Sequence, residues 1–234
     1  EAFGVMAITL MVITIVSLLS DLGLRLNVIQ SRQGDNPEFL NTIWVIQIVR
    51  GILIFLACLV LSAGLHATAQ RGLLPQGSTY ADPILPLVLA ILSLNAVITG
   101  FESTKTLLAS RNLALGRLTL IEISGQLCGL ISMIVFSLAS RSIWTLVVGA
   151  LVAALARTLL SHAVLPGARN RFQWHPESFR EILSFGKWIV PASIVGILLS
   201  NGDRLFLGGL LAPEILGLYS IAFLITGAIT DLFQ

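Results

Sequence analysis

Residues 40–65, LNTIWVIQIVRGILIFLACLVLSAGL, form an apolar run whose only charged side chain is Arg50. A helix needs about 20 apolar residues to cross the hydrocarbon core of a bilayer, so this run is long enough to span a membrane. The whole chain shares this character, because 56% of its 234 residues are hydrophobic and only 11% are charged. A soluble domain carries about 25% charged residues. The sequence therefore predicts an all-α, polytopic transmembrane helix bundle.

Seven segments of the chain are apolar and long enough to be predicted as spans. They are residues 2–20, 40–65, 84–100, 118–138, 143–165, 188–210 and 216–233. The chain begins with Glu1, inside an apolar run, and stops soon after the last segment. We therefore expect it to be a fragment of a longer protein.

The basic residues of the loops predict the orientation of these spans. The loops after spans one, three and five carry nine basic residues: Arg25, Arg32, Lys105, Arg111, Arg117, Arg169, Arg171, Arg180 and Lys187. The alternate connections carry three: Arg71, Arg141 and Arg204. Lys and Arg are retained on the cytoplasmic side of membrane proteins. We therefore predict that the nine-residue set is cytoplasmic and that residue 1 is external.

Two copies of one sequence pattern indicate an internal repeat. Residues 1–8 read EAFGVMAI and residues 214–221 read EILGLYSI, 213 residues apart. Both copies open an apolar segment and, in the predicted topology, run inward from the same face. Many secondary transporters are built from such repeats. A repeat of six helices implies a helix preceding Glu1, and we expect a groove for that helix between spans one and six.

The polar stretch 167–175 separates two groups of spans and is the best domain boundary. After it, residues 176–187 alternate apolar and charged side chains and begin with Pro176, which suits a first helical turn. We interpret them as an interfacial amphipathic helix on the cytoplasmic face. The predicted organisation is an N-terminal bundle (1–168, its first helix missing), a cytoplasmic linker (169–187) and a truncated C-terminal bundle (188–234).

Charged residues within or at the edges of the spans are the candidate functional residues, since a charge at mid-bilayer is costly and usually faces a bundle interior or a watery cavity. They are Asp21, Arg25, Arg50, Glu122, Arg157, Asp203, Arg204 and Asp231, with Asn201 beside the adjacent pair. Arginines there could bind an anion such as pyrophosphate through bidentate hydrogen bonds. The alternative is structural, because arginines near span ends reach the headgroups or pair with acids to hold helices together.

Small residues in the spans are interpreted as packing residues. Gly125 and Gly129 form a G-x-x-x-G pair that favours close helix contact. Cys58 and Cys128 lie within apolar segments and lack the spacing of a metal site.

Several short motifs resemble the polysaccharide transporters of the MOP superfamily, the Wzx-like flippases of lipid-linked oligosaccharides. They are FGVMA (3–7), LLSDLGL (18–24), VIQ (28–30), FGKW (185–188), NGDRL (201–205) and PEILGLYS (213–220), in the family's order. The resemblance implies a two-lobed fold of 12–14 helices around a central cavity, of which this chain would be helices two to eight. It also implies that the first, second, seventh and eighth helices line the cavity. These correspond here to spans one, six and seven, so the resemblance favours Asp21, Arg25, Asn201, Asp203, Arg204 and Asp231 over Arg50, Glu122 and Arg157.

The resemblance implies a flippase, not an enzyme, that moves an undecaprenyl-pyrophosphate-linked oligosaccharide across the bacterial cytoplasmic (inner) membrane for O-antigen, capsule or exopolysaccharide synthesis. No cofactor or metal is expected beyond a coupling ion, H⁺ or Na⁺. The expected partners are the lipid-linked oligosaccharide, membrane lipids and other polysaccharide assembly proteins, with no nucleic acid. The alternatives are a MATE-type drug/cation antiporter, a membrane-embedded polysaccharide polymerase or ligase, and a scaffold that does not transport.

Overall fold

The computed structural model of the chain describes residues 2–20, 23–72, 78–140, 142–208, 210–211, 215, 217–223 and 226. Within these ranges the regular structure is helical. In chain order the elements are α1 (Ala2–Leu19), α2 (Leu24–Gln30), α3 (Pro37–Gln70), η1 (Thr79–Ala81), α4 (Leu85–Leu92), α5 (Leu94–Gly100), α6 (Lys105–Arg111), α7 (Leu115–Ala139), α8 (Trp144–Ala163) and α9 (Pro176–Gly208). Residues 217–223 are also helical. The predicted all-α class is confirmed.

Within the described residues, the long helices begin and end within a few residues of the predicted spans, apart from two differences. The third predicted span is divided between α4 and α5 at Ser93, and α9 joins the sixth span to the segment before it. By length and composition, α3, α7 and α8 can each cross a membrane. The α4–α5 unit with α6 qualifies as a fourth, bent by 66°. The described residues therefore contain three spans, or up to four, and the number seven stays a prediction.

The start of α3 shows how local sequence sets a helix boundary. The Asn36 side chain accepts a hydrogen bond from the Glu38 backbone N–H at 3.0 Å, which caps the helix. Pro37 occupies the first turn, where its missing N–H costs nothing. The Glu38 carboxylate also lies at the positive end of the helix dipole. Asn-Pro-Glu is thus a start signal that fixes where the longest helix enters the bundle.

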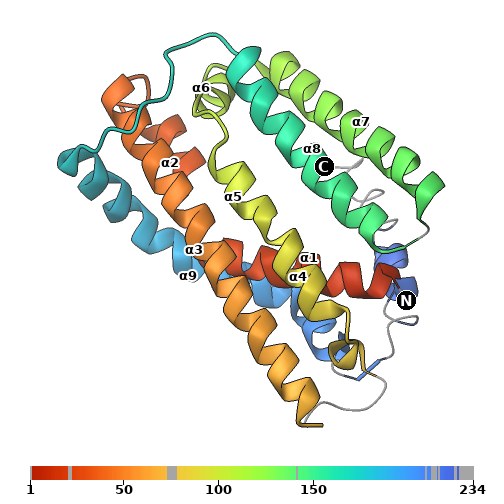
Figure 1. Cartoon of the computed structure of the whole chain (residues 1–234). Coiled ribbons are helices and arrows are strands. Elements are labelled where there is room, and N and C mark those ends of the chain that lie inside the picture. The colour runs from red at the N-terminus through yellow and green to blue at the C-terminus, as the bar shows by residue number, and fades with distance from the viewer. Residues whose placement is uncertain are drawn as a thin grey trace.

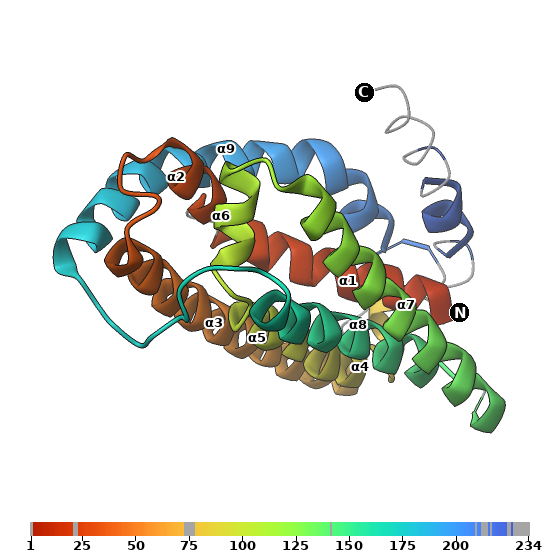
Figure 2. The same ribbon diagram turned by 90° about the horizontal axis from the view of Figure 1, so that it is seen from above.

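The connections alternate between the two ends of the bundle (Figure 1). α2, α6 and the segment 164–175 gather at one end, at the upper left of the view. The start of α1, the end of α3 and the α7–α8 connection lie at the other end. Seen from above, α7 and α8 run side by side, while α1 lies alongside α9 (Figure 2). The loops that carry the predicted cytoplasmic basic residues therefore lie at one end of the molecule.

Two buried clusters hold the helices together. The larger cluster joins α1, α3, α4, α5 and α8 through Val5, Ile8, Met11, Ile13, Ile54, Cys58, Leu85, Val88, Leu89, Leu92, Ala96, Ile143 and Val147. The smaller cluster lies at the end with the basic loops and joins α2, α3 and α9 through Leu24, Val28, Phe39, Leu40, Ile43, Ile46 and Ile182. Cys58 is fully buried in the larger cluster, which agrees with its interpretation as a packing residue.

The position of α9 differs from two expectations. Residues 176–187 are helical as predicted, but Ile182 is fully buried against α2 and α3, with Phe179 packed beside it. The apolar side of this segment therefore covers protein, and whether it also touches the membrane surface stays a prediction. In addition, α9 packs directly on α1, whereas a groove for a helix preceding Glu1 was expected between these two spans. The division into two bundles stays a prediction.

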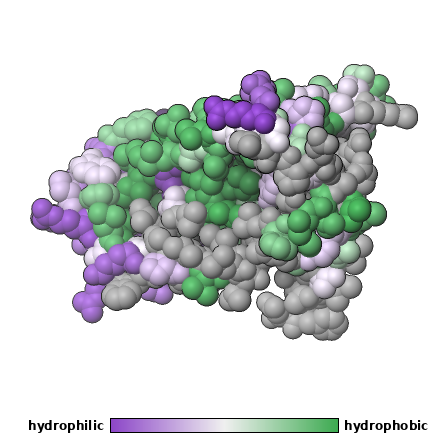
Figure 3. All heavy atoms as spheres, turned by 90° about the horizontal axis from the view of Figure 1, so that it is seen from below, coloured by the Kyte–Doolittle hydropathy of each residue, from purple (hydrophilic) through white to green (hydrophobic). Residues whose placement is uncertain are grey.

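Much of the described surface is apolar. In the space-filling view from below, hydrophobic residues cover the centre of the described surface, and hydrophilic residues gather at the left edge and in a group at the top (Figure 3). On α7, large apolar side chains remain exposed along most of the helix: Leu120, Ile123, Leu127, Leu130, Ile131, Ile134, Val135 and Leu138. An exposed apolar surface of this size is untypical of soluble monomers and suits contact with lipid. The chain is a multi-pass membrane protein.

Candidate functional site

A charged cavity lies where α2, α3, α5, α6, α7 and α8 converge. It consists of two pockets of about 490 and 460 Å³ that share Arg25, Glu102, Thr106, Leu107 and Arg157. The first pocket reaches α1 and α3, and the second extends along α7 to Glu122. The ionisable residues that line the cavity are three arginines and two glutamates, which leaves one net positive charge among the described lining residues.

Arg157 on α8 is held between the two carboxylates. Its Nη2 atom lies 2.9 Å from Oε2 of Glu102, and its Nη1 atom lies 3.1 Å from Oε2 of Glu122. The Glu102 side chain is 13% exposed and the Glu122 side chain is 49% exposed. Hydrogen bonds between ionised groups are stronger than neutral ones. The ion pairs therefore join the α5–α6 connection, α7 and α8 around one guanidinium group.

Arg50 on α3 is tied to the end of α1. Its Nη2 atom donates to the Ser17 carbonyl at 2.8 Å, and its Nε atom donates to Ser20 Oγ at 3.2 Å. The last carbonyls of a helix lack partners within the helix and form the negative end of its dipole. Arg50 therefore lines the cavity and also caps α1. At least part of its guanidinium group has a structural role, because it holds α3 against the end of α1.

Arg25 on α2 differs from both Arg157 and Arg50. Its exposed side chain lines both pockets, and it makes no hydrogen bond or ion pair with any described residue. An arginine always carries its charge and offers five N–H donors in a planar fork. Among the described arginines of the cavity, Arg25 is the one with all five donors available to a ligand.

Close helix packing brings polar groups into the cavity. A methyl group added at Gly51 would lie 2.4 Å from the Ala96 carbonyl, and one at Gly100 would lie 3.2 Å from the Gln47 carbonyl. α3 and α5 can approach this closely only because both positions are glycine. Asn95 and Gln47 lie beside this contact and line the cavity, and the buried Oδ1 atom of Asn95 has no hydrogen-bond partner among the described groups.

The break between α5 and α6 directs Glu102 into the cavity. Gln47 Nε2 donates to the Thr99 carbonyl at 3.0 Å and to the Glu102 carbonyl at 3.4 Å. His162 Nε2 lies 2.8 Å from the Phe101 carbonyl, to which Trp44 also donates at 3.5 Å. Backbone groups freed at a break in a membrane helix need such partners. Side chains of α3 and α8 thus stabilise the bend that exposes Glu102 to the cavity.

The structure brings together four of the residues singled out from the sequence: Arg25, Arg50, Glu122 and Arg157. The backbone of Asn201, Asp203 and Arg204 belongs to α9, but their side chains lie outside the description, as do Asp21 and Asp231 altogether. Their assignment to the cavity stays a prediction. Glu102 was missed by the sequence analysis. A signal existed, because Asn95, Thr99 and Glu102 follow the spacing of one helix face within an apolar segment.

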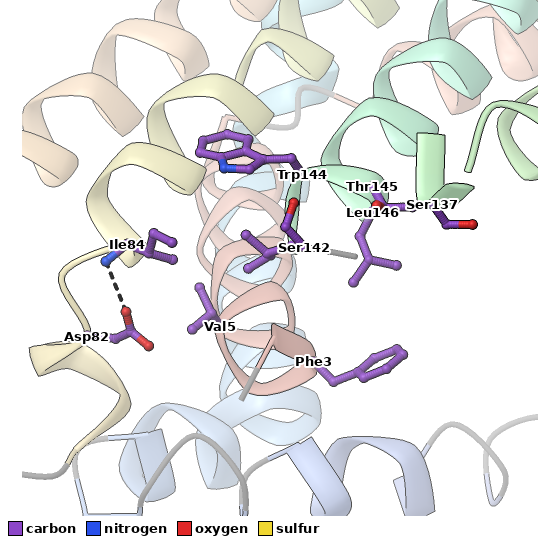
Figure 4. Close-up of a pocket in the computed structure, with 10 residues that line it drawn as sticks. Phe3, Val5, Asp82, Ile84, Ser137, Ser142, Trp144, Thr145 and Leu146 are labelled. Carbon is purple, nitrogen blue, oxygen red and sulfur yellow. Dashed lines mark hydrogen bonds between the residues drawn. The ribbon is translucent and has the colours of Figure 1, made fainter. Parts of the chain in front are cut away.

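A second pocket of about 570 Å³ lies at the opposite end of the bundle (Figure 4). It is lined by Phe3, Val5, Asp82, Ile84, Ser137, Ser142, Ile143, Trp144, Thr145 and Leu146. Asp82 is its one ionisable lining residue among those described, and its Oδ1 atom accepts from the Ile84 backbone N–H at 2.9 Å (Figure 4). The single carboxylate of this pocket already accepts a hydrogen bond within the turn before α4. The pocket therefore lacks the cluster of arginines and glutamates that lines the charged cavity. The charged cavity is therefore the candidate functional site.

Comparison with known proteins adds an independent line of evidence. The chain matches the family described as polysaccharide biosynthesis protein over residues 1–234. It is also 26% identical, over 227 residues, to the lipopolysaccharide biosynthesis protein WzxC of Escherichia coli strain K12. The aligned region covers 94% of this chain and 43% of that relative, so the chain spans less than half of the relative's length. No solved structure matches the chain.

Proposed function

This chain belongs to the polysaccharide biosynthesis protein family, and from that premise we propose that it is part of a flippase for lipid-linked oligosaccharides. The substrate is an undecaprenyl-pyrophosphate-linked oligosaccharide, which moves from the inner to the outer leaflet of the bacterial cytoplasmic membrane. Surface polysaccharide synthesis, of O-antigen, capsule or exopolysaccharide, then uses the translocated lipid. The protein acts as a transporter, not as an enzyme.

One observation carries the proposal: the guanidinium group of Arg25 lines both pockets of the charged cavity without a partner among the described residues. A pyrophosphate that enters a protein interior loses its water and needs fixed donors in exchange. Arg25 offers such donors, and the described lining residues of the cavity carry one net positive charge. The fork of a guanidinium group matches phosphate oxygens in a bidentate manner.

The cavity composition also weighs against the cation antiporter. Both described carboxylates of the cavity, Glu102 and Glu122, are already paired with Arg157 at 2.9 and 3.1 Å. A cationic drug would need an unpaired acid, whereas an anion finds Arg25 available. The described part of the cavity therefore favours an anionic substrate.

The transport cycle follows from the same chemistry. The prenyl tail stays in the bilayer while the pyrophosphate and sugars pass along the basic cavity, and the two lobes of the full-length protein alternate in exposing it. Asp203 and Arg204, with Asn201, Asp21 and Asp231, complete the cavity in this proposal by their resemblance to the flippases. A gradient of H⁺ or Na⁺ drives the cycle, with a carboxylate such as Asp203 as the ion ligand.

The test uses full-length protein in cells that lack their own flippase. Arg25→Ala should reduce export of the lipid-linked glycan about ten- to a hundredfold, since a hydrogen bond to a charged group contributes about 1.5–3 kcal/mol. Arg25→Lys should restore part of the export, because lysine keeps the charge but loses the planar fork. The measurement is surface polysaccharide together with the lipid-linked intermediate that accumulates in the membrane.

Arg117→Ala is the matched control, because Arg117 is exposed at the start of α7 and lines no described pocket. It should export at the wild-type rate. Wild-type export by Arg25→Ala, at normal protein levels in the membrane, would show that Arg25 does not hold the substrate.

A further inference from the structure

A further pocket, lined by two arginines, lies outside the charged cavity, at the end of the bundle that carries the basic loops. It has a volume of about 360 Å³ and is lined by Pro37, Asn41, Ala168, Arg169, Arg171 and Gln173. It shares no lining residue with the charged cavity. The segment 168–173, which follows α8 and precedes α9, forms one wall, and the first turns of α3 form the other.

The side chains of residues 169–173 alternate between the pocket and the bundle. Arg169, Arg171 and Gln173 line the pocket, whereas the residues between them bind the bundle. Asn170 accepts a hydrogen bond from Ser103 Oγ at 2.7 Å, and the Phe172 ring packs on Trp44 with centroids 4.6 Å apart.

Hydrogen bonds from α3 fix the arginine-bearing backbone. Asn41, which is buried, accepts from the Arg171 backbone N–H at 3.0 Å and donates from Nδ2 to Gln173 Oε1 at 2.9 Å. The His175 backbone N–H donates to Thr42 Oγ1 at 3.2 Å. The two guanidinium groups are therefore attached to a backbone that is already ordered, and a ligand does not have to order it.

The guanidinium groups themselves are available. Arg169 and Arg171 are exposed, and neither guanidinium group has a hydrogen bond or ion pair with a described residue. Of the two acids at the start of α3, Asp35 forms an ion pair with Arg111 at 3.6 Å, and the Glu38 carboxylate lies 3.8 Å from the His175 ring. Two unpaired arginines and an amide in one small pocket form a site for a phosphate group.

Exposed aromatic rings beside the pocket indicate where this phosphate comes from. Phe172 is 70% exposed and Trp174 is 47% exposed, although both rings also contact other aromatic rings. They lie next to the ends of α3 and α8, two helices long enough to span the membrane. Aromatic rings at span ends belong to the headgroup zone, and basic pockets there bind anionic lipid headgroups.

We propose that Arg169 and Arg171 form a binding site for the phosphate headgroup of an anionic phospholipid. The site is independent of the transported substrate, and it anchors the connection between α8 and α9 to the lipid surface. The ligand class is phosphatidylglycerol or another phospholipid with a net negative headgroup.

The experiment titrates purified full-length protein in detergent with phosphatidylglycerol and, separately, with phosphatidylcholine, and counts bound lipid by native mass spectrometry. Phosphatidylglycerol should bind the wild type in preference to phosphatidylcholine. A hydrogen bond to a charged group contributes about 1.5–3 kcal/mol, so the double variant R169Q/R171Q should bind it at least about tenfold more weakly. The R169K/R171K variant should retain most of the binding, which also shows that substitution here does not unfold the protein.

R32Q/R180Q is the matched control, because it removes two exposed arginines from the same end of the bundle that do not line the pocket. Its binding should stay within about twofold of the wild type. Equal losses in both double variants would reduce the effect to overall charge and overturn the proposal, as would wild-type binding by R169Q/R171Q. Inorganic pyrophosphate is the competitor: if it displaces phosphatidylglycerol at equal concentration, the site is a soluble-anion site and not a lipid site.

Discussion

The arginines of this chain show that one residue type takes several roles, which the neighbouring atoms decide. Arg111 donates from Nη1 to the carbonyls of Val28, Ile29 and Ser31, and so caps the end of α2. Arg50 caps α1 in the same manner. Arg157 is neutralised by two carboxylates, whereas Arg25 makes no hydrogen bond or ion pair with a described residue. A count of charges in spans therefore overstates the number available to a substrate.

The two carboxylates around Arg157 should contribute unequally to stability. Glu102 is largely shielded from solvent and lies closer to Arg157, so Glu102→Gln should lower the free energy of unfolding by about 1–3 kcal/mol. Glu122 is half exposed, and Glu122→Gln should cost less than about 1 kcal/mol. Thermal unfolding of the purified full-length protein measures both. A larger loss for Glu122→Gln would show that burial does not rank these two ion pairs.

Four charges that interrupt or border predicted spans lie in the charged cavity, and their role in binding a substrate stays a prediction. The sequence analysis missed Glu102, whose polarity follows a helix face. Arg25, Arg50, Glu122 and Arg157 stand out because each is a charge within or beside an apolar run. Glu102 lies at the end of its apolar segment, where a charge looks like an ordinary loop residue. Its role depends on a bend that brings it back to Arg157, and that bend is set by other helices.

At the scale of elements, the bend between α5 and α6, just after the third predicted span, shows what local sequence cannot fix. The predicted span 84–100 is mostly apolar, although it contains Ser93, Asn95 and Thr99. The break is stabilised by Gln47, Trp44 and His162, which lie more than 50 residues away in the chain and donate to its carbonyls. A pattern of hydrophobicity reports burial, and it carries no information about such distant hydrogen bonds.

Packing between α7 and α8, in contrast, was predictable. The sequence pair Gly125 and Gly129 indicated close helix contact, and both residues are buried against α8. A methyl group at Gly129 would lie 2.8 Å from both Ala153 Cβ and the Gly149 carbonyl. The prediction is confirmed because the G-x-x-x-G spacing acts through backbone approach alone, without a distant polar partner.

Two glycines of α3 provide a matched test of close packing beside the charged cavity. Gly51→Ala should destabilise the protein by about 1–3 kcal/mol, since the new methyl group would lie 2.4 Å from the Ala96 carbonyl and force α3 and α5 apart. Gly64→Ala meets nothing within 4 Å and should be neutral or stabilising by up to about 1 kcal/mol. Thermal unfolding measures both, and export should fall with Gly51→Ala only. Equal stability of the two variants would mean that the α3–α5 contact is looser than described.

At the scale of the whole molecule, the sequence predicted which segments are helical and at which end each loop lies. The number of spans and the lobe arrangement stay predictions, because they depend on helices packing over long sequence distances. The six-helix repeat stays a prediction. α9 packs directly on α1, where a groove was expected. A methyl group at Gly217 would lie 3.2 Å from the Gly4 backbone N, so the two segments of the repeated pattern are in contact.

The clustering of basic loops at one end of the bundle gives the last prediction, which concerns orientation. In full-length protein with Cys58→Ala and Cys128→Ala, single cysteines at the exposed positions Gln70 and Ser140 should react with an impermeant reagent added to intact cells. Cysteines at the exposed positions Arg32 and Asn112, at the opposite end, should not react until the membrane is opened. The physical reason is retention of Lys and Arg on the cytoplasmic side. Labelling of all four positions after permeabilisation is the control for reactivity. The inverse pattern in intact cells would put the basic end outside, and the lipid site at Arg169 and Arg171 would then face the outer leaflet.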